Sequence, residues 1–238
     1  MSLTVAVLDA SLGDTPAEAN LRRSLDAEVD VYGVSEGAFP PSVSASDWRY
    51  DAVVVSGSQL AVYDDRDWIH ELTEWFRRTH AADVPTLGVC FGHQFVAQAL
   101  GGRVVDMGRY ELGYREVSRV GEDPLFADVP RRFTSFETHS DRVAELPPGA
   151  ATLARNEFGV QAFRVDSAYG VQFHPEYDRE TAEWVIDGKE LSEERRREVL
   201  ATVTDEAVAD ARTATRVFDS FLAFAAAHQP VTRAPGRY

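Results

Sequence analysis

The only cysteine in the chain, Cys90, follows an apolar run and lies between Gly88 and Gly92. An apolar strand that ends in Gly-x-Cys-x-Gly and continues as a helix is typical of a nucleophile elbow, a tight turn that holds the reactive side chain at its apex. Glycine suits both flanking positions because the elbow backbone is strained and its neighbours approach closely. A sulfur at the start of a helix also lies near the positive end of the helix dipole, which favours the thiolate. Most unpaired cysteines are instead small buried hydrophobic residues, so this pattern alone leaves both interpretations open.

His174 and Glu176 could supply the other groups that a cysteine nucleophile requires. They follow the strand-like run 169–173 in the order His-Pro-Glu. Side chains two residues apart on an extended chain point to the same side, so the carboxylate can lie beside the imidazole. The imidazole would take a proton and return it, while the carboxylate holds the imidazole in the required tautomer. Together with Cys90, these residues predict a triad for attack on a carbonyl carbon.

The two segments resemble the signature of a known family. Gly-Val-Cys-Phe-Gly-His-Gln at 88–94 and Gln-Phe-His-Pro-Glu at 172–176, whose cysteine and histidine are 84 positions apart, resemble the motifs of the class I (triad) glutamine amidotransferases. The resemblance covers about residues 3–177. The sequence Thr-His-Ser-Asp-Arg-Val at 138–143 is similar to the His-x-Asp-x-Val segment of the glutaminase part of GMP synthases. We therefore expect a protein similar to their stand-alone glutaminase domains.

The resemblance implies roles for the triad in a two-step reaction. Cys90 would attack the side-chain amide of glutamine and form a γ-glutamyl thioester. His174 would deliver a proton to the leaving ammonia and then activate the water that releases glutamate, with Glu176 orienting its ring.

Further residues around the elbow are expected to bind the oxyanion and the substrate. The backbone amide of Phe91, directly after the nucleophile, would stabilise the oxyanion, and by similarity so would that of Gly57. Many relatives have a second glycine where Ser58 stands. The resemblance assigns substrate binding to Gln94, one helical turn after the cysteine, and to Ser140, although Ser140 fits a simple turn residue nearly as well.

The acceptor of the ammonia is not visible in the sequence, and three functions stay open. The resemblance implies no cofactor, and the lack of a nucleotide-binding segment favours ammonia transfer to a separate synthetase. A stand-alone γ-glutamyl hydrolase acting on a small γ-glutamyl amide or peptide would have the same triad with a different pocket. The third hypothesis is a catalytically weak regulatory protein on the same fold, which an intact triad disfavours.

Two further patterns resemble a metal site and a phosphate-binding loop, but each lacks a residue that such a site requires. His139 and Asp141 are of metal-ligating types, yet no third ligand follows at a spacing typical of metal sites, so we expect no metal. The turn at 56–58 is no phosphate loop because no lysine follows it.

Composition and charge limit the partners of the protein. A chain of 238 residues with 44% hydrophobic residues can form one globular domain with a full core. A formal net charge of −15 argues against binding to nucleic acid. No apolar stretch is long enough to span a membrane and no signal sequence is evident, so we expect a cytoplasmic protein without a membrane partner. Lys189 is the only lysine, which is typical of a halophilic source, although genomic base composition has the same effect.

The order of the predicted elements indicates an α/β fold with a doubly wound, mostly parallel sheet, as in flavodoxin-like proteins. Apolar strands over 4–9, 28–34, 51–58 and 86–90 alternate with helices over 16–27 and 67–81. From residue 103 onward the chain changes to short extended segments at 114–120, 132–138, 151–154, 161–165 and 168–173. In the family this part forms an antiparallel layer and then returns to the main sheet, which places the histidine strand beside the cysteine strand.

The last third departs most from the family pattern. We expect helices over 179–188, 191–202 and, as one long helix, 205–228. The catalytic domain is predicted over 1–187, and 188–238 is predicted to be a helical C-terminal extension packed on the same domain, with a flexible tail at 230–238. Because charged helix faces are usually solvated, we expect the inserted middle part to pack structurally and to supply no catalytic element.

Overall fold

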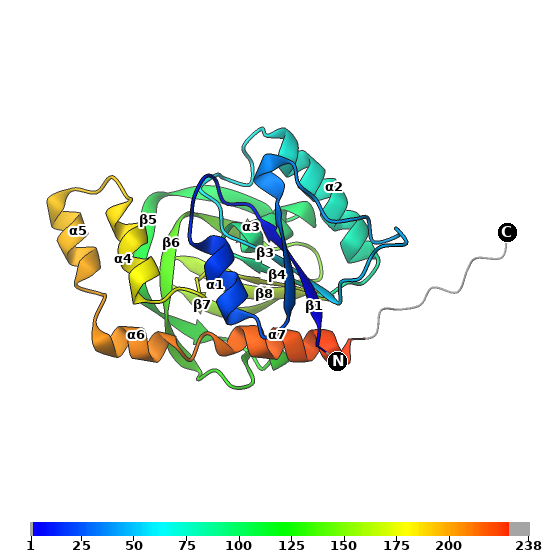
Figure 1. Cartoon of the computed structure of the whole chain (residues 1–238). Helices are drawn as coiled ribbons and strands as arrows, with labels where there is room; N and C mark the ends of the chain where they lie inside the picture. The colour runs from blue at the N-terminus through cyan, green and yellow to red at the C-terminus, as the bar shows by residue number, and fades with distance from the viewer. Residues whose placement is uncertain (1, 229–238) are drawn as a thin grey trace.

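Nine strands form one continuous sheet in the computed structural model, which describes residues 2–228 (Figure 1). Five neighbouring strands run parallel, in the order β2 (Glu28–Gly33), β1 (Thr4–Asp9), β3 (Ala52–Val55), β4 (Thr86–Val89) and β9 (Ala168–Val171). The sheet continues with the antiparallel strands β8 (Gly159–Val165), β7 (Ala151–Asn156), β5 (Arg103–Arg119) and β6 (Arg132–Glu145). The predicted α/β fold with a parallel half and an antiparallel half is confirmed.

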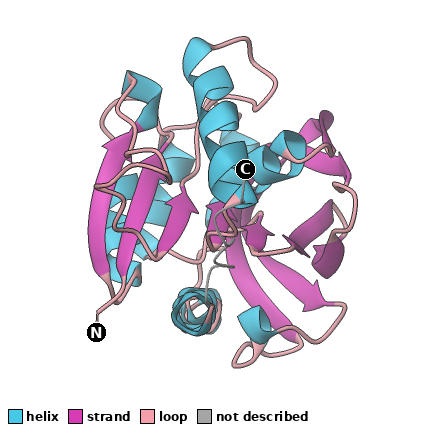
Figure 2. Cartoon of the chain, turned by 90° about the vertical axis from the view of Figure 1, so that its right-hand side faces the viewer, coloured by secondary structure: helices cyan, strands magenta, loops and turns pink. Residues whose placement is uncertain are grey.

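Helices cover both faces of the parallel half, which explains why its inner strands β1, β3, β4 and β9 are mostly apolar and buried, whereas the edge strand β2 is not. One face of β1 presents Val5 and Val7 to a core that includes α1 (Ala17–Ser24) and α7 (Arg216–Ala227). The opposite face presents Ala6 and Leu8 to a second core, beneath α2 (Asp67–Ala81) and α3 (Phe91–Ala99). Figure 2 views α7 end-on and shows how the helices enclose the sheet. Alternate residues of a strand therefore stabilise different helical layers.

The return of the chain to the main sheet brings the two halves of the predicted site together. All four residues of β9 are buried, and the strand lies parallel to β4, with Val89 opposite Val171. The amide of Cys90 donates to the carbonyl of Val171 at 2.9 Å, and the amide of His174 donates to the carbonyl of Phe136 at 2.9 Å. The expected placement of the histidine strand beside the cysteine strand is confirmed.

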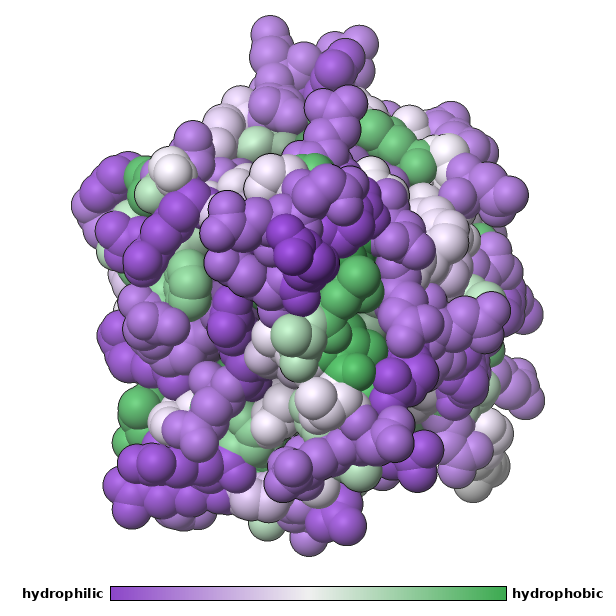
Figure 3. Space-filling view, turned by 90° about the vertical axis from the view of Figure 1, so that its left-hand side faces the viewer, coloured by the Kyte–Doolittle hydropathy of each residue, from purple (hydrophilic) through white to green (hydrophobic). Residues whose placement is uncertain are grey.

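Three C-terminal helices cover the outer strands β5 and β6. They are α4 (Arg179–Asp187), α5 (Glu193–Leu200) and α6 (Asp205–Ala211). Val185, Val199 and Ala211, one residue from each helix, are buried in a third cluster with Leu112 and Phe136 of the sheet. The face of the molecule that carries α4 and α5 is otherwise mostly hydrophilic, with a narrow apolar strip (Figure 3).

The prediction of one long helix over 205–228 is wrong. Residues 212–215 form turns between α6 and α7, although the two helices follow each other nearly in line (Figure 1). The hydroxyls of Thr213 and Thr215 each donate to the carbonyl three residues before them, at 2.8 and 2.7 Å. Such side-chain bonds compete with the helical ladder. Ala214 is fully buried in the main core, so packing also favours the interruption.

Strands β5 and β6 extend well beyond the segments predicted at 114–120 and 132–138. Their additional residues mix polar and apolar types, because parts of both strands are exposed and the alternation is weak. The pairing is also irregular between Asp106 and Glu111, where Gly108 has a φ of 66°. The tail predicted to be flexible at 230–238 lies outside the described residues. Among residues 2–228, no helix is both long and apolar enough to cross a membrane.

Candidate active site

Cys90 occupies a strained turn between β4 and α3. Its φ of 54° and ψ of −102° lie outside the regions that most residues adopt. A Cβ at Gly88 would overlap the carbonyl oxygen of Gly92, and a Cβ at Gly92 would overlap that of Val55. Both glycines are therefore required by close backbone contact, and the elbow predicted from the sequence is present.

His174 is held in a fixed orientation at the end of β9. Its Nδ1 lies 2.8 Å from Oε1 of Glu176, and both side chains are almost fully buried. The ring of Tyr177 stacks on the imidazole with centroids 4.1 Å apart. Because Nδ1 is occupied by the carboxylate, Nε2 is the nitrogen left for proton transfer.

Gly57 is in contact with both the nucleophile and the histidine. A Cβ placed on Gly57 would lie 3.1 Å from Cε1 of His174 and 3.8 Å from Cβ of Cys90. The three residues thus meet at one point, although they are far apart in the sequence. The thiol also lies 3.9 Å from the carbonyl oxygen of Thr138, so β6 closes the site from the other side.

The electrostatics of this site favour a charged imidazole. Burial opposes the charge, but the carboxylate of Glu176 and the neighbouring Cys90 raise the pKa of His174 to about 10. An imidazolium beside the sulfur stabilises a thiolate, which is the nucleophilic form of cysteine. The arrangement is therefore suited to nucleophilic attack and to proton donation to a leaving group.

A cleft of about 540 Å³ opens over the elbow. All seven residues that the sequence predicts as site residues line it, namely Cys90, His174, Glu176, Gly57, Phe91, Gln94 and Ser140. A volume in this range is ordinary for a small-molecule site.

Gln94 is restrained by its neighbours in a way that limits its role. Its Nε2 donates to the carbonyl of Asp141 at 3.1 Å and to Oε1 of Gln172 at 3.0 Å. Both amide hydrogens are thereby used within the protein. The carbonyl oxygen of the side chain remains to accept a hydrogen bond from a ligand.

The structure adds charged residues to the cleft that the sequence did not assign to the active site. Asp64, Asp106 and Asp141 lie close enough for the first two to raise the pKa of Asp141, after burial, which is the larger cause. Lys189, just beyond α4, is the only lysine or arginine among the described residues that line the cleft. Its Nζ lies 5.0 Å from the centre of the Tyr110 ring. Lys189 is notable in the sequence because it is the only lysine, but nothing in the sequence indicates that it lies in the same cleft as Cys90.

The search for a third ligand by spacing from His139 and Asp141 did not find the carboxylates that lie beside the His139 ring. They are Glu137, two residues earlier on β6, and Glu111, which is opposite His139 on β5. The carboxylate of Asp141, which the sequence suggested as its companion, instead accepts a hydrogen bond from Tyr63 at 3.0 Å. The sequence held a signal for Glu137, since side chains two residues apart on a strand share a face, but spacing along β6 does not show Glu111, which comes from the neighbouring strand.

The family model of the class I glutamine amidotransferases matches residues 7–186. The chain belongs to this family. The match includes the elbow, the His-Pro-Glu segment and all the cleft residues named above except Lys189.

The curated relatives of this class I amidotransferase include both GMP synthases and gamma-glutamyl peptidases. GMP synthase of Thermomicrobium roseum is 38% identical over 125 residues, which are 52% of this chain and 23% of the relative. Gamma-glutamyl peptidase 3 of Arabidopsis thaliana is 32% identical over 170 residues, 66% of each chain. The glutamine-hydrolyzing GMP synthase subunit of Thermococcus kodakarensis is 43% identical over 97 residues, 40% of this chain and 52% of the relative. The chain thus spans 23% to 66% of the length of these relatives.

Solved structures share the fold of this amidotransferase over nearly its whole length. A glutamine amidotransferase of Methylobacillus flagellatus has a TM-score of 0.77 at 21% identity and covers 100% of both chains. A glutamine amidotransferase of Thermotoga maritima has a TM-score of 0.75 at 22% identity, covering 92% of this chain and 98% of its own. These similarities support the fold assignment.

Proposed function

We propose that the protein hydrolyses the side-chain amide of glutamine through a thioester on Cys90 and supplies the ammonia to a separate synthetase. The observation that carries this proposal is the meeting of Cys90, His174 and Glu176 at the base of the cleft. Thiolate, imidazolium and carboxylate are the groups that acyl transfer from an amide needs.

In the first step, the Cys90 thiolate attacks the amide carbon of the substrate, and the carbonyl oxygen becomes an oxyanion. Gly57 and Phe91 line the cleft, and their backbone amides would stabilise that charge. The imidazolium of His174 gives its proton to the nitrogen as the C–N bond breaks. Ammonia leaves, and the γ-glutamyl group remains bound to sulfur.

In the second step, His174 takes a proton from water as the water oxygen attacks the thioester. The C–S bond breaks, glutamate is released, and the thiolate and imidazolium are restored. Glu176 keeps Nδ1 protonated in both steps and so holds Nε2 available for the transfers.

Charged groups of the cleft suit the amino acid end of glutamine. The side-chain oxygen of Gln94 and the acidic side chains of Asp64, Asp106 and Asp141 can bind an α-ammonium group. Lys189 can pair with a carboxylate. Ser140 lines the same wall and would contribute a backbone contact.

The proposed synthetase partner rests on the similarity to GMP synthases, among them the subunit from Thermococcus kodakarensis. A cytoplasmic location and a halophilic source belong to the same proposal, and the net charge of −15 with a single lysine supports the halophilic source.

A second candidate is hydrolysis of a γ-glutamyl peptide. It is favoured by the match to gamma-glutamyl peptidase 3 of Arabidopsis thaliana, which covers 66% of each chain. Lys189 adds a structural argument, since the amine that leaves a γ-glutamyl peptide carries a carboxylate that ammonia lacks.

Turnover by the purified protein tests these functions. Glutamate and amine release would be measured from glutamine and from γ-glutamylglycine, with Cys90→Ser as the inactive control and hydroxylamine to trap the thioester. Glutamine hydrolysis that increases when the synthetase part of a GMP synthase is added supports the first function. Cleavage of the peptide without cleavage of glutamine supports the second. A folded wild-type protein that is inactive on both substrates contradicts both and favours a regulatory role.

A further inference from the structure

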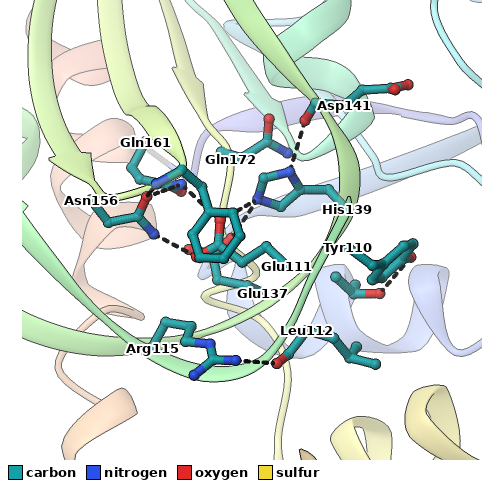
Figure 4. Close-up of polar contacts among 12 residues, drawn as sticks. Tyr110, Glu111, Leu112, Arg115, Glu137, His139, Asp141, Asn156, Gln161 and Gln172 are labelled. Carbon is teal, nitrogen blue, oxygen red and sulfur yellow. Dashed lines mark hydrogen bonds and ion pairs between the residues drawn. The ribbon is translucent and has the colours of Figure 1, made fainter. Parts of the chain in front are cut away.

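Glu111, Glu137 and His139 form a closed polar cluster behind the wall of the cleft (Figure 4). Glu111 belongs to β5, and the other two belong to β6. The side chains of Glu111 and Glu137 are fully buried, and the imidazole of His139 is 3% exposed. One ligand-type atom from each residue lies within 4.8 Å of the other two.

The orientation of the His139 ring leaves one nitrogen facing both carboxylates. Nδ1 hydrogen-bonds with the carbonyl oxygen of Asp141 at 2.8 Å, so Nδ1 carries a proton. Nε2 lies 2.9 Å from Oε2 of Glu111 and 3.3 Å from Oε2 of Glu137, yet it makes a hydrogen bond with neither. Both carboxylates are thus within ion-pair distance of one nitrogen. A cation placed among the three side chains would be in contact with both carboxylates and with this nitrogen.

Glu137 provides an independent indication of a missing partner. Both of its carboxylate oxygens are buried and make no hydrogen bond with any described residue. Burying an unpaired carboxylate is costly, and a buried group without a partner indicates an ion or a water at that place. In the described part of the chain, no lysine or arginine forms an ion pair with Glu111 or Glu137.

We propose that Glu111, Glu137 and His139 bind one divalent transition-metal ion, of which Zn²⁺ is the best-suited example. Two carboxylates and a neutral imidazole balance the charge of a divalent cation. One nitrogen and several oxygens are a donor set that Zn²⁺ accepts.

The spacing of the donor atoms fits such an ion. Bonds of about 2.1 Å place neighbouring ligand atoms about 3.0 Å apart at right angles and about 3.4 Å apart at the tetrahedral angle. The separations of 2.9 and 3.3 Å from Nε2 are of this size. Neither oxygen of Glu137 makes a hydrogen bond with a described residue, so this carboxylate can bind through both oxygens and three residues can supply four donor atoms.

The groups around the cluster orient the ligands as in metal sites. The bond from His139 to the carbonyl of Asp141 fixes the ring with Nε2 directed into the cluster. The carboxylate of Glu111 accepts hydrogen bonds from Asn156 at 2.6 Å and Gln161 at 3.3 Å. His139 also lines the cleft, which gives an ion a route from solvent.

The ion would act on the active site through position and would take no part in the reaction. The carbonyl of Asp141 that receives the His139 bond also receives the amide of Gln94, the proposed substrate-binding side chain. Fixing His139 therefore fixes the group that orients Gln94. This consequence rests on the proposed function, whereas the binding of the ion does not.

Metal analysis in a Cys90→Ser background tests the proposal without any contribution from the active-site sulfur. The protein would be unfolded with a chelator, refolded with Zn²⁺, passed over a desalting column and analysed by mass spectrometry for metal content. We expect about one Zn²⁺ per chain. With Co²⁺ in its place, we expect visible absorption bands of a nitrogen and oxygen site without a sulfur charge-transfer band.

Glu137→Gln in the same background keeps the shape of the side chain but removes a charged ligand. We expect its Zn²⁺ content to fall at least tenfold, while Glu145→Gln, an exposed position on the same strand, retains the ion. Near-ultraviolet circular dichroism would verify folding, and His139→Gln serves if Glu137→Gln fails to fold. The proposal is overturned if the folded Cys90→Ser protein retains neither Zn²⁺ nor Co²⁺, or if the cluster variants retain as much as the control. Neither result depends on catalytic activity, so failure of the proposed function is distinguishable.

Discussion

Oε1 of Glu176 lies 2.8 Å from Nδ1 of His174, and both side chains are buried beside the elbow. The carboxylate therefore determines which imidazole nitrogen is free for proton transfer. This relationship leads to a prediction about each partner.

Glu176→Gln is expected to reduce kcat for glutamine by about 10²–10⁴-fold, because the amide permits the wrong tautomer of His174. Steady-state kinetics with Glu176→Gln and Glu180→Gln, an exposed matched control on α4, would measure the effect. A kcat for Glu176→Gln within a factor of about two of the control would refute the proposed role of the carboxylate.

The contribution of His174 to stability is expected to decrease at alkaline pH. Its pKa is raised from 6.5 to about 10 in the folded protein, so folding is favoured by this group fully below about pH 6.5 and loses that support as the pH rises to about 10. The free energy of unfolding of the wild type minus that of His174→Gln, from urea denaturation at pH 6.5 and pH 10, should become smaller at the higher pH. A difference that is constant or grows with pH would show that the ring is neutral in the folded state.

Gly92→Ala is expected to destabilise the protein by about 1–3 kcal/mol or more, because the new methyl group would overlap the backbone of Val55. Backbone in the middle of a buried sheet cannot move aside as a side chain can. Gly121→Ala is the control, since nothing lies within 4 Å of a Cβ at that position. Thermal unfolding of the two variants should separate them clearly, and equal Tm values would argue against the close packing of the elbow.

Lys189→Ala is expected to raise KM for γ-glutamylglycine by about fivefold, the size of a partly exposed ion pair, if the leaving carboxylate contacts the ammonium group. KM for glutamine should then change less, and Lys189→Arg should retain most of the affinity. An equal rise for both substrates would instead place Lys189 at the α-carboxylate that the two substrates share.

Salt is expected to stabilise this acidic protein. The net charge of −15 causes repulsion across the surface, and the screening length falls from about 10 Å at 0.1 M salt to about 3 Å at 1 M. Tm measured by calorimetry should therefore rise with KCl over this range. A decrease in Tm would mean that attractive surface ion pairs outweigh the repulsion.

Local sequence was sufficient for the parts of the site that depend on short segments. The backbone angles of Cys90 and the close contact between Gly88 and Gly92 follow from one turn of chain, whereas the contact of Gly92 with Val55 comes from the neighbouring strand. The side chains of His174 and Glu176 point to the same side of the extended chain because the two residues are two positions apart. The pairing of β4 with β9 came from the family resemblance, because apolar runs do not show which strand lies beside which.

Features that depend on pairing between distant strands were missed. Glu111 and His139 are opposite each other in the β5–β6 ladder, but an irregularity between Asp106 and Glu111 hides the register. The break between α6 and α7 was missed although Thr213 and Thr215, which are weak helix formers, flank Ala214. Their hydroxyl bonds and the burial of Ala214 in the main core together favour the interruption, and the burial is a tertiary contact that local sequence does not show.

Strand β6 supports the histidine, the cleft wall and the buried polar cluster at the same time. Phe136 holds the backbone of His174, and the next residues include Glu137, Thr138 and His139. Since a slip of one residue in a β-ladder reverses every side chain, these functions cannot be lost separately by a change of register. Insertion or deletion of one residue within β6, ahead of Phe136, should therefore abolish activity as a single event, even though it alters no residue that touches the substrate.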